Sequence, residues 1–295
     1  MKSLVLYHGN CRDGQVAAWC AKRHYGDEAI YVPCFYGDVP AEAYARLYKD
    51  IVIVDFCFSR ETLTRMAGRC ERLTVLDPHV TARDMLTGWH DQPKNVKTVF
   101  NMEASGAYLS WYHFAQFGDE CLPIVKYTQD HDLWKFQEPY SKEVRAWMHL
   151  FPLDDLQAVD YMDDSITECL SLVVDAGSTL IQATKIRTKR VADTSVHIDI
   201  GYNARIANSS TDVSEAGHAI LEAFPECEVS ITYYDDLPSG KTRYSLRSRK
   251  GGVDVSKIAK ALGGGGHPNA AGFEDTSTNF HYLAESWRET IKAAK

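Results

Sequence analysis

Acidic and imidazole side chains stand where short apolar segments of this chain end, and a parallel sheet would gather them along one edge. They are His8, Asp13, Asp55, Asp77, His79, Asp130 and Asp132. Converging carboxylates repel one another and raise each other's pKa, and a divalent cation removes that cost. A mixed Asp and His shell suits Mn²⁺ or a similar borderline ion better than Mg²⁺ or Ca²⁺. Such an ion polarises a phosphoryl oxygen and lowers the pKa of a bound water, so the set is suited to hydrolysis of a phosphate ester.

Some members of this set have a purely structural alternative. A single Asp after a strand commonly caps the next helix, which applies to Asp13 and Asp77. Asp55 closes a fully apolar run, where a buried carboxylate is harder to explain by structure alone. His131 lies between two of the acidic residues, and its role stays open.

A second unusual segment lies near the C-terminus, where four consecutive glycines precede His267. Glycine backbone can approach a ligand closely and aim several N–H groups at one anion, as Gly264, Gly265 and Gly266 could. His267 would add a titratable donor beside that anion. The alternative is a helix C-cap, because a helical pattern ends at Leu262.

Arginines alternate along residues 243–249, just before the glycines. A strand would place Arg243, Arg247 and Arg249 on one face and Tyr244 and Leu246 on the other. Guanidinium groups on one face suit bidentate phosphate binding, and we expect Arg247 to make that contact. The alternative is an edge strand that its charges keep from pairing with another chain.

The elements that position the first set alternate between strand and helix. Strand-like segments are expected at 4–8, 30–35, 51–56, 73–76 and 96–100, and 124–132 is taken as a further strand end. Helical segments are expected at 14–24, 59–70, 81–89 and 104–117. This alternation predicts an α/β fold with a doubly wound, mostly parallel sheet and helices on both faces. Ligands of such sheets bind beyond the carboxyl ends of the strands.

The rest of the chain follows two other patterns. Residues 141–192 carry only helical periodicity and are predicted to connect two domains, 1–140 and 193–295. The second domain is predicted to be a smaller α+β domain, with strands at 196–200, 204–208, 229–234 and 242–249 and helices at 214–224, 254–262 and 280–292.

Bulk composition narrows the class of protein. The chain has 295 residues, 45% of them hydrophobic and 24% charged, which fits a globular protein of two domains. A net charge of −8 disfavours a broad nucleic-acid surface. Eight cysteines without a C-x-x-C pair indicate reduced thiols. No signal peptide or membrane span is recognisable, so we expect a cytoplasmic protein.

The motifs, in this order, resemble the DHH/DHHA1 phosphoesterase superfamily, especially its bacterial and phage-type phosphohydrolases. The matching segments are 8–14, 77–82, 105–107, 130–134, 245–248, 254–259 and 263–273, so the resemblance spans nearly the whole chain. The resemblance implies a Mn²⁺-dependent phosphoesterase, or one using Mg²⁺ or another divalent cation, with one or two ions. It implies that His8, Asp13, Asp55 and Asp130 bind metal, that Asp77 and His79 are catalytic, and that Arg247, Gly264, Gly265, Gly266 and His267 bind substrate.

Two positions depart from that family. Pro78 stands where the Asp-His-His motif has its first histidine, which is normally a metal ligand and which proline cannot replace. Cys11 stands where many branches have a metal-binding Asp, although this branch commonly carries Cys. A thiolate could itself coordinate a soft metal.

We therefore expect a metal-dependent phosphodiesterase that hydrolyses a short oligonucleotide, dinucleotide or cyclic dinucleotide with metal-activated water in an interdomain cleft. Long duplex nucleic acid and membranes are not expected partners. One alternative is a non-catalytic or single-metal nucleotide-binding protein, and another is a phosphomonoesterase or pyrophosphatase. The 141–192 segment could mediate a homodimer, although nothing in its pattern requires one.

Overall fold

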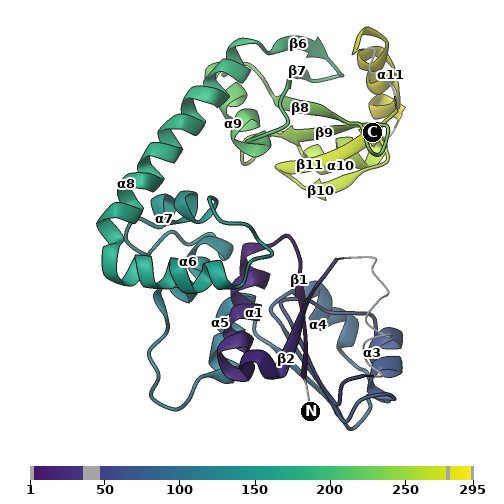
Figure 1. Cartoon of the computed structure of the whole chain (residues 1–295). Helices are drawn as coiled ribbons and strands as arrows, with labels where there is room; N and C mark the ends of the chain where they lie inside the picture. The colour runs from purple at the N-terminus through teal and green to yellow at the C-terminus, as the bar shows by residue number, and fades with distance from the viewer. Residues whose placement is uncertain (1–2, 36–46, 277–279, 294–295) are drawn as a thin grey trace. The chain divides into compact units, whose positions relative to one another are not determined.

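The protein consists of two compact units, Met1–Thr179 and Leu180–Lys295 (Figure 1). The computed structural model describes residues 3–35, 47–276 and 280–293. The boundary between the two units lies inside helix α8 (Gln157–Asp193), after Thr179. A residue with non-helical backbone, Cys169, interrupts the same helix nearer its start. The predicted connector at 141–192 is therefore divided between the two units. Within the described ranges, no helix is both long enough and apolar enough to cross a bilayer.

A five-stranded parallel sheet forms the centre of the first unit and confirms the predicted fold class. Its strands are β1 (Ser3–His8), β2 (Ala29–Cys34), β3 (Asp50–Val54), β4 (Arg72–Asp77) and β5 (Val96–Phe100), in the order β2-β1-β3-β4-β5. After β2 the chain returns past β1 to form β3. The direction of strand addition therefore reverses between β1 and β3, which is where sheets of this type bind ligands.

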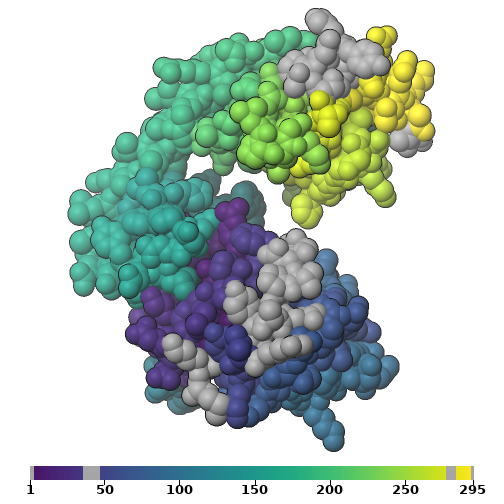
Figure 2. All heavy atoms as spheres, turned by 45° about the vertical axis from the view of Figure 1, so that its right-hand side comes forward, coloured from purple at the N-terminus to yellow at the C-terminus, as the bar shows by residue number. Residues whose placement is uncertain are grey.

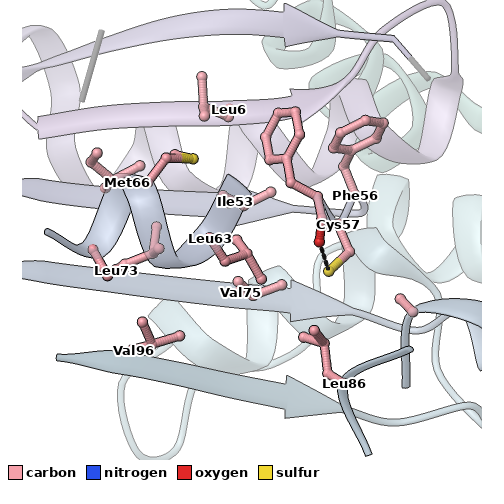
Figure 3. Packing of buried hydrophobic residues seen from close by; sticks show 14 of the residues in the cluster. Leu6, Ile53, Phe56, Cys57, Leu63, Met66, Leu73, Val75, Leu86 and Val96 are labelled. Carbon is pink, nitrogen blue, oxygen red and sulfur yellow. Dashed lines mark hydrogen bonds between the residues drawn. The ribbon is translucent and has the colours of Figure 1, made fainter. Parts of the chain in front are cut away.

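Helices cover both faces of this sheet because alternate strand residues are apolar on each side. On one face α3 (Arg60–Ala67) and α4 (Val80–Leu86) pack on the strands, and Figure 3 shows Leu63 and Met66 of α3 in this cluster. On the other face lie α1 (Arg12–Tyr25) and α5 (Gly106–Phe114). The four predicted helices of this region are thus present.

The strand expected at 124–132 is wrong, because this segment is helix α6 (Pro123–Asp132). Proline occupies the first turn, where its missing N–H costs nothing. Buried Ile124, Val125, Tyr127 and Thr128 follow helical spacing. Helix α7 (Ser141–Met148) and the first part of α8 pack with α6 on α1. In Figure 2 this teal region lies against the purple N-terminal residues.

Gly177 sets the distance between α8 and α7. A Cβ atom at this position would overlap the Glu143 carbonyl oxygen. We expect Gly177→Ala to lower the free energy of unfolding by about 1–3 kcal/mol, because backbone cannot yield as a side chain can. Ser178→Ala on the same helix should be close to neutral. Urea unfolding of both variants measures the difference, and equal stabilities would contradict the close packing.

The second unit contains a six-stranded sheet in the order β10-β11-β9-β8-β7-β6. The strands are β6 (Val196–Asp199), β7 (Asn203–Asn208), β8 (Val229–Asp236), β9 (Lys241–Arg247), β10 (Gly265–His267) and β11 (Ala270–Asp275). Only β7 and β8 pair in parallel among the described strands of this sheet. The helices are α9 (Val213–Ala223), α10 (Val255–Ala261) and α11 (Phe280–Ala293). The β10–β11 hairpin was not predicted.

The alternation along β9 is confirmed. Tyr244 and Leu246 are buried, and the Tyr244 ring stacks on Phe273 with centroids 4.8 Å apart. Since β9 lies between β11 and β8, the edge-strand alternative for its arginines is wrong.

Candidate metal centre

Three potential ligands meet at the carboxyl edge of β1 and β3. His8 ends β1, Cys11 caps α1, and Asp55 follows β3. Each offers one ligand atom, and these atoms lie within 4.8 Å of one another. The structure thus brings together two predicted ligands, His8 and Asp55, and adds Cys11. Among the described residues, this is the one group of three or more potential ligands so closely spaced.

Asp55 is the most constrained of the three. Its side chain is 2% exposed, and its backbone adopts a left-handed conformation with φ of 54°. Its Oδ2 atom lies 3.5 Å from His8 Nδ1, within ion-pair distance of a protonated His8, and accepts no hydrogen bond within the described part of the chain. A buried carboxylate oxygen without a donor is costly, and a cation would satisfy it. A divalent ion therefore fits the donor set of Asp55, His8 and Cys11.

Asp13 lies beside Asp55 and anchors the start of α5. Its carboxylate oxygens accept hydrogen bonds from the backbone N–H groups of Gly106, at 2.6 Å, and Ala107, at 2.9 Å. Burial and the charge of Asp55 raise the pKa of Asp13. Burial also raises the pKa of Asp55, although His8 and His79 oppose that shift. Two adjacent buried carboxyl groups carry an electrostatic cost that a cation would offset.

Two glycines make this crowding possible. A Cβ atom at Gly106 would overlap Asp55 and lie 2.5 Å from its Oδ1. A Cβ atom at Gly14 would overlap the His8 carbonyl oxygen and lie 2.9 Å from its Cβ. Both glycines lie in segments that carry the family resemblance, and the structure shows their steric purpose.

Asp77 and His79 form a hydrogen-bonded pair at the end of β4. The buried Asp77 Oδ1 accepts from the backbone N–H and from Nδ1 of His79, both at 2.7 Å. This bond raises the pKa of His79 to about 9, and Asp55 and Asp13 add to the shift. Because Nδ1 is occupied, Nε2 is the ring atom that can reach a ligand or substrate.

The structure places Asp130 and Asp132 in different surroundings, since residues two apart on a helix do not face each other. The Asp130 carboxylate accepts from the backbone N–H groups of Gln137, at 2.7 Å, and Glu138, at 3.2 Å. It thus closes the loop after α6 and is not part of the ligand group.

The sequence places Asp132 near the other acidic residues but predicts no separate role for it. Its side chain is exposed, yet the protein around its carboxyl group and the charge of Asp13 raise its pKa to about 6. The charges of His79, Arg145 and His8 oppose that shift, so the pKa of Asp132 depends on the charged groups around the ligand group. In the sequence, the Asp-x-Asp spacing of residues 130–132 was the signal that pointed to Asp132.

His131 is a structural residue. Burial lowers its pKa to about 4, so it is neutral at physiological pH. Its ring lies 5.5 Å from Trp134 and 5.7 Å from Phe136, centroid to centroid. Both aromatic residues have left-handed backbone, which is uncommon outside glycine.

Of the three arginines predicted to share a strand face, Arg247 is the one suited to an anion. Arg243 pairs with Asp236 and Glu274, and Arg249 donates to backbone carbonyls near the end of α9. Arg247 donates to Ser214 Oγ at 3.3 Å and has no ion pair within the described part of the chain. Burial lowers its pKa. Gly217 leaves room for its stem, since a Cβ there would lie 2.8 Å from Arg247 Cγ.

The glycine segment has the helix-capping role, which is one of the two roles expected for its backbone. Gly263 is left-handed, with φ of 84°, and the Gly264 N–H donates to the Ala259 carbonyl at 2.8 Å, so these two residues end α10. That bond occupies the Gly264 N–H, which we had expected to face a phosphate. Gly265, Gly266 and His267 form β10 and are exposed.

Comparison with known proteins identifies the C-terminal part first. The family model of the DHHA1 domain matches residues 204–293. The fold of the chain is similar to the pGpG-specific phosphodiesterase PggH of Vibrio cholerae, with a TM-score of 0.55, 13% identity and 100% coverage of both chains. Residues 204–293 therefore match the DHHA1 family, and the whole chain shares the fold of PggH.

Two further proteins are similar to this chain. The DHH domain of a member of the s1p family of ribosomal proteins shares the fold, with a TM-score of 0.54, 15% identity, and coverage of 99% of this chain and 86% of that one. The uncharacterized protein R106 of Acanthamoeba polyphaga mimivirus is 28% identical over 288 residues. That alignment covers 91% of this chain but 66% of the viral protein, so this chain spans just under two thirds of its relative's length.

At the end of β4, Pro78 separates Asp77 from His79. The proline ring offers no ligand atom, and Asp77 is bonded to His79. The residues that the structure describes thus offer one compact ligand group, centred on Asp55.

Proposed function

We propose that this chain is a metal-dependent phosphodiesterase that cleaves short nucleotides. The observation that carries the proposal is the donor-free Asp55 oxygen beside His8 and Cys11, at the point where strand addition reverses. The first unit supplies this centre. The DHHA1 match of residues 204–293 and the fold shared with the phosphodiesterase PggH support the reaction class.

His8, Cys11 and Asp55 would hold the cation. Nitrogen and sulfur donors depart from the all-oxygen shell that Mg²⁺ prefers, so this set suits a transition-metal ion such as Mn²⁺ better than Mg²⁺. An ion held there would polarise a phosphoryl oxygen and lower the pKa of an adjacent water. Asp55 and Cys11 raise the pKa of His8 to about 10, so ion binding must compete with a proton on this ring.

His79 is the proposed proton donor, and Asp77 positions it. With a pKa of about 9, the imidazole carries protons on both nitrogens at neutral pH. Asp77 holds the Nδ1 proton, which leaves Nε2–H to donate to the leaving oxygen of a phosphate ester. Asp13 fixes the α5 turn against which Asp55 rests.

A linear dinucleotide is the substrate we expect, because PggH, a protein of similar fold, is specific for pGpG. The test is a panel of pGpG, pApA, a cyclic dinucleotide, pyrophosphate and a phosphomonoester, each with Mn²⁺ and with EDTA. We expect Mn²⁺-dependent release of mononucleotides from the linear dinucleotides. Turnover of pyrophosphate or the monoester alone would replace this proposal with the corresponding alternative.

Pro78 supports a second candidate, a protein that binds nucleotides without turnover. Its position deprives the motif of one histidine. This candidate predicts tight dinucleotide binding and no product in the wild type, with hydrolysis gained in Pro78→His. Hydrolysis by the wild type would exclude it.

Arg247 is the proposed phosphate contact of the second unit, together with His267 and the Gly265 and Gly266 backbone. We expect Arg247→Ala to raise KM for the dinucleotide about tenfold, because hydrogen bonds to charged groups contribute roughly 1.5–3 kcal/mol. Arg243→Ala removes the same charge from a residue already paired with Asp236 and should leave KM unchanged. Equal effects of the two variants would contradict a specific contact.

A further inference from the structure

A cavity of about 840 Å³ opens beside the metal centre of the first unit. Cys11 contributes to its wall, whereas His8, Asp13, Asp55 and His79 do not. The cavity therefore adjoins the proposed reaction site without being part of it. Its volume is in the range of small-molecule binding pockets.

The cavity contains two arginines with opposite properties. Arg12 donates to the carbonyl oxygens of Met148, at 2.6 Å, and Phe151, at 2.8 Å, and to Gln15, so it ties α1 to the chain after α7. Arg145 of α7 makes no hydrogen bond or ion pair with any described residue, and its Nε atom is buried without a partner. Arg12 is structural, whereas Arg145 has no direct partner among the described residues and is attracted only at longer range, by carboxylates such as Asp132 and Asp13.

Burying part of the Arg145 guanidinium without a hydrogen-bond partner lowers the stability of the fold. Arginine stays protonated in proteins, so it cannot relieve burial by losing its charge. A buried charge without a partner costs several kcal/mol, and an incoming anion would offset that cost. The planar guanidinium matches the oxygens of a phosphate group especially well.

The rest of the lining suits a flat apolar group. Pro33, Phe35, Phe151 and Leu153 face the cavity, and Asn10, in left-handed backbone, adds a polar side chain. Asp154 also lines it and would repel a phosphate placed near it, which leaves the Arg145 side for the anion. The combination of guanidinium, apolar wall and polar groups matches a nucleotide with its phosphate at Arg145.

We propose that this cavity binds the terminal nucleotide of the substrate, with Arg145 holding a phosphate group other than the one under attack. The inference rests on the proposed function and deepens it. It makes Arg145 a specificity-determining residue, which distinguishes a phosphorylated dinucleotide from one that ends in a free hydroxyl.

The test compares pApA with ApA, which lacks the terminal phosphate. Binding is measured calorimetrically in EDTA, and KM is measured with Mn²⁺. We expect the wild type to bind pApA about tenfold more tightly than ApA, a typical gain for a charge-assisted contact. Arg145→Met should reduce that ratio to about twofold or less, and Arg145→Lys should give an intermediate ratio.

Controls separate a lost contact from lost structure. Lys142→Ala removes an exposed positive charge from the same helix and should preserve the ratio. Arg145→Met removes an unpaired charge, so its Tm should equal or exceed that of the wild type. A wild-type ratio near one, or a ratio that survives Arg145→Met, overturns the inference.

The outcomes also separate this inference from the proposed function. An Arg145-dependent preference for pApA in a protein that hydrolyses neither compound would overturn the function and leave the binding site standing. Hydrolysis with no preference between pApA and ApA would overturn the binding site and leave the function standing.

Discussion

Asp55→Asn should abolish Mn²⁺-dependent hydrolysis, with a loss on the order of a thousandfold, because Lewis-acid stabilisation amounts to several kcal/mol. The variant keeps the size of the side chain and removes the charged oxygen that lacks a donor. Hydrolysis of pApA by purified protein measures the effect. Asp84→Asn, which alters an exposed carboxylate on α4, is the matched control and should retain full activity.

The same substitution should stabilise the metal-free protein. Burial raises the pKa of Asp55 above its ordinary value of 3.8. The unfolded chain therefore ionises at lower pH than the folded one, and stability falls as pH rises from about 4 through the raised pKa. Asn has no such titration, so the variant should have the higher Tm in EDTA near neutral pH.

Added Mn²⁺ should reverse that order. An ion at about a hundredfold its Kd stabilises the wild type by about 2.7 kcal/mol, and the variant should gain little. Thermal melts of the wild type and Asp55→Asn, with Mn²⁺ and with EDTA at several pH values, measure both the pH effect and the metal effect on Tm. If the variant gains as much from Mn²⁺ as the wild type, Asp55 is not a ligand.

Gly106→Ala should have the second largest effect, although it adds a single methyl group. That group would overlap Asp55, while the Gly106 N–H must still reach Asp13. Either α5 or the Asp55 side chain must move. Displaced support of a ligand typically costs tenfold to a hundredfold in metal affinity or activity, and we expect about a hundredfold loss of activity here.

Gly68→Ala is the matched control for Gly106→Ala. Its Cβ would find only carbonyl oxygens at 3.7 Å, an ordinary contact, and its backbone is right-handed. The control should be neutral or slightly stabilising. Calorimetric titration with Mn²⁺ compares the two variants, and unchanged affinity in Gly106→Ala would show that Asp55 tolerates the added group.

The parallel sheet was predictable because its strands are short, apolar runs separated by helical periodicity. The strand prediction for 124–132 was wrong because a short β-branched run such as Ile124–Val125 suits a strand or a buried helix equally. Proline at position 123 was the discriminating signal, since it favours the first turn of a helix.

The site was predictable in part. The motif spacing gave His8 and Asp55, which the structure brings together, whereas the metal roles of Asp13 and Asp130 stay predictions. Arg145 could not be found from sequence, because it occupies an ordinary position in an amphipathic helix. Only three-dimensional packing shows that its guanidinium has no partner among the described residues.

The hydrogen bonds that hold Asp13 have a consequence for ion selection. Its two oxygens are fixed by main-chain groups at the start of α5, so the carboxylate cannot rotate without disturbing the first turn of that helix. An ion arriving beside a preorganised group immobilises little further side-chain motion, which lowers the entropic cost of binding. Rigid surroundings also fix the size of the space that an ion can occupy. Ions of different radius then bind with different affinity. We therefore expect discrimination among metals to be decided when the chain folds, before any ion arrives.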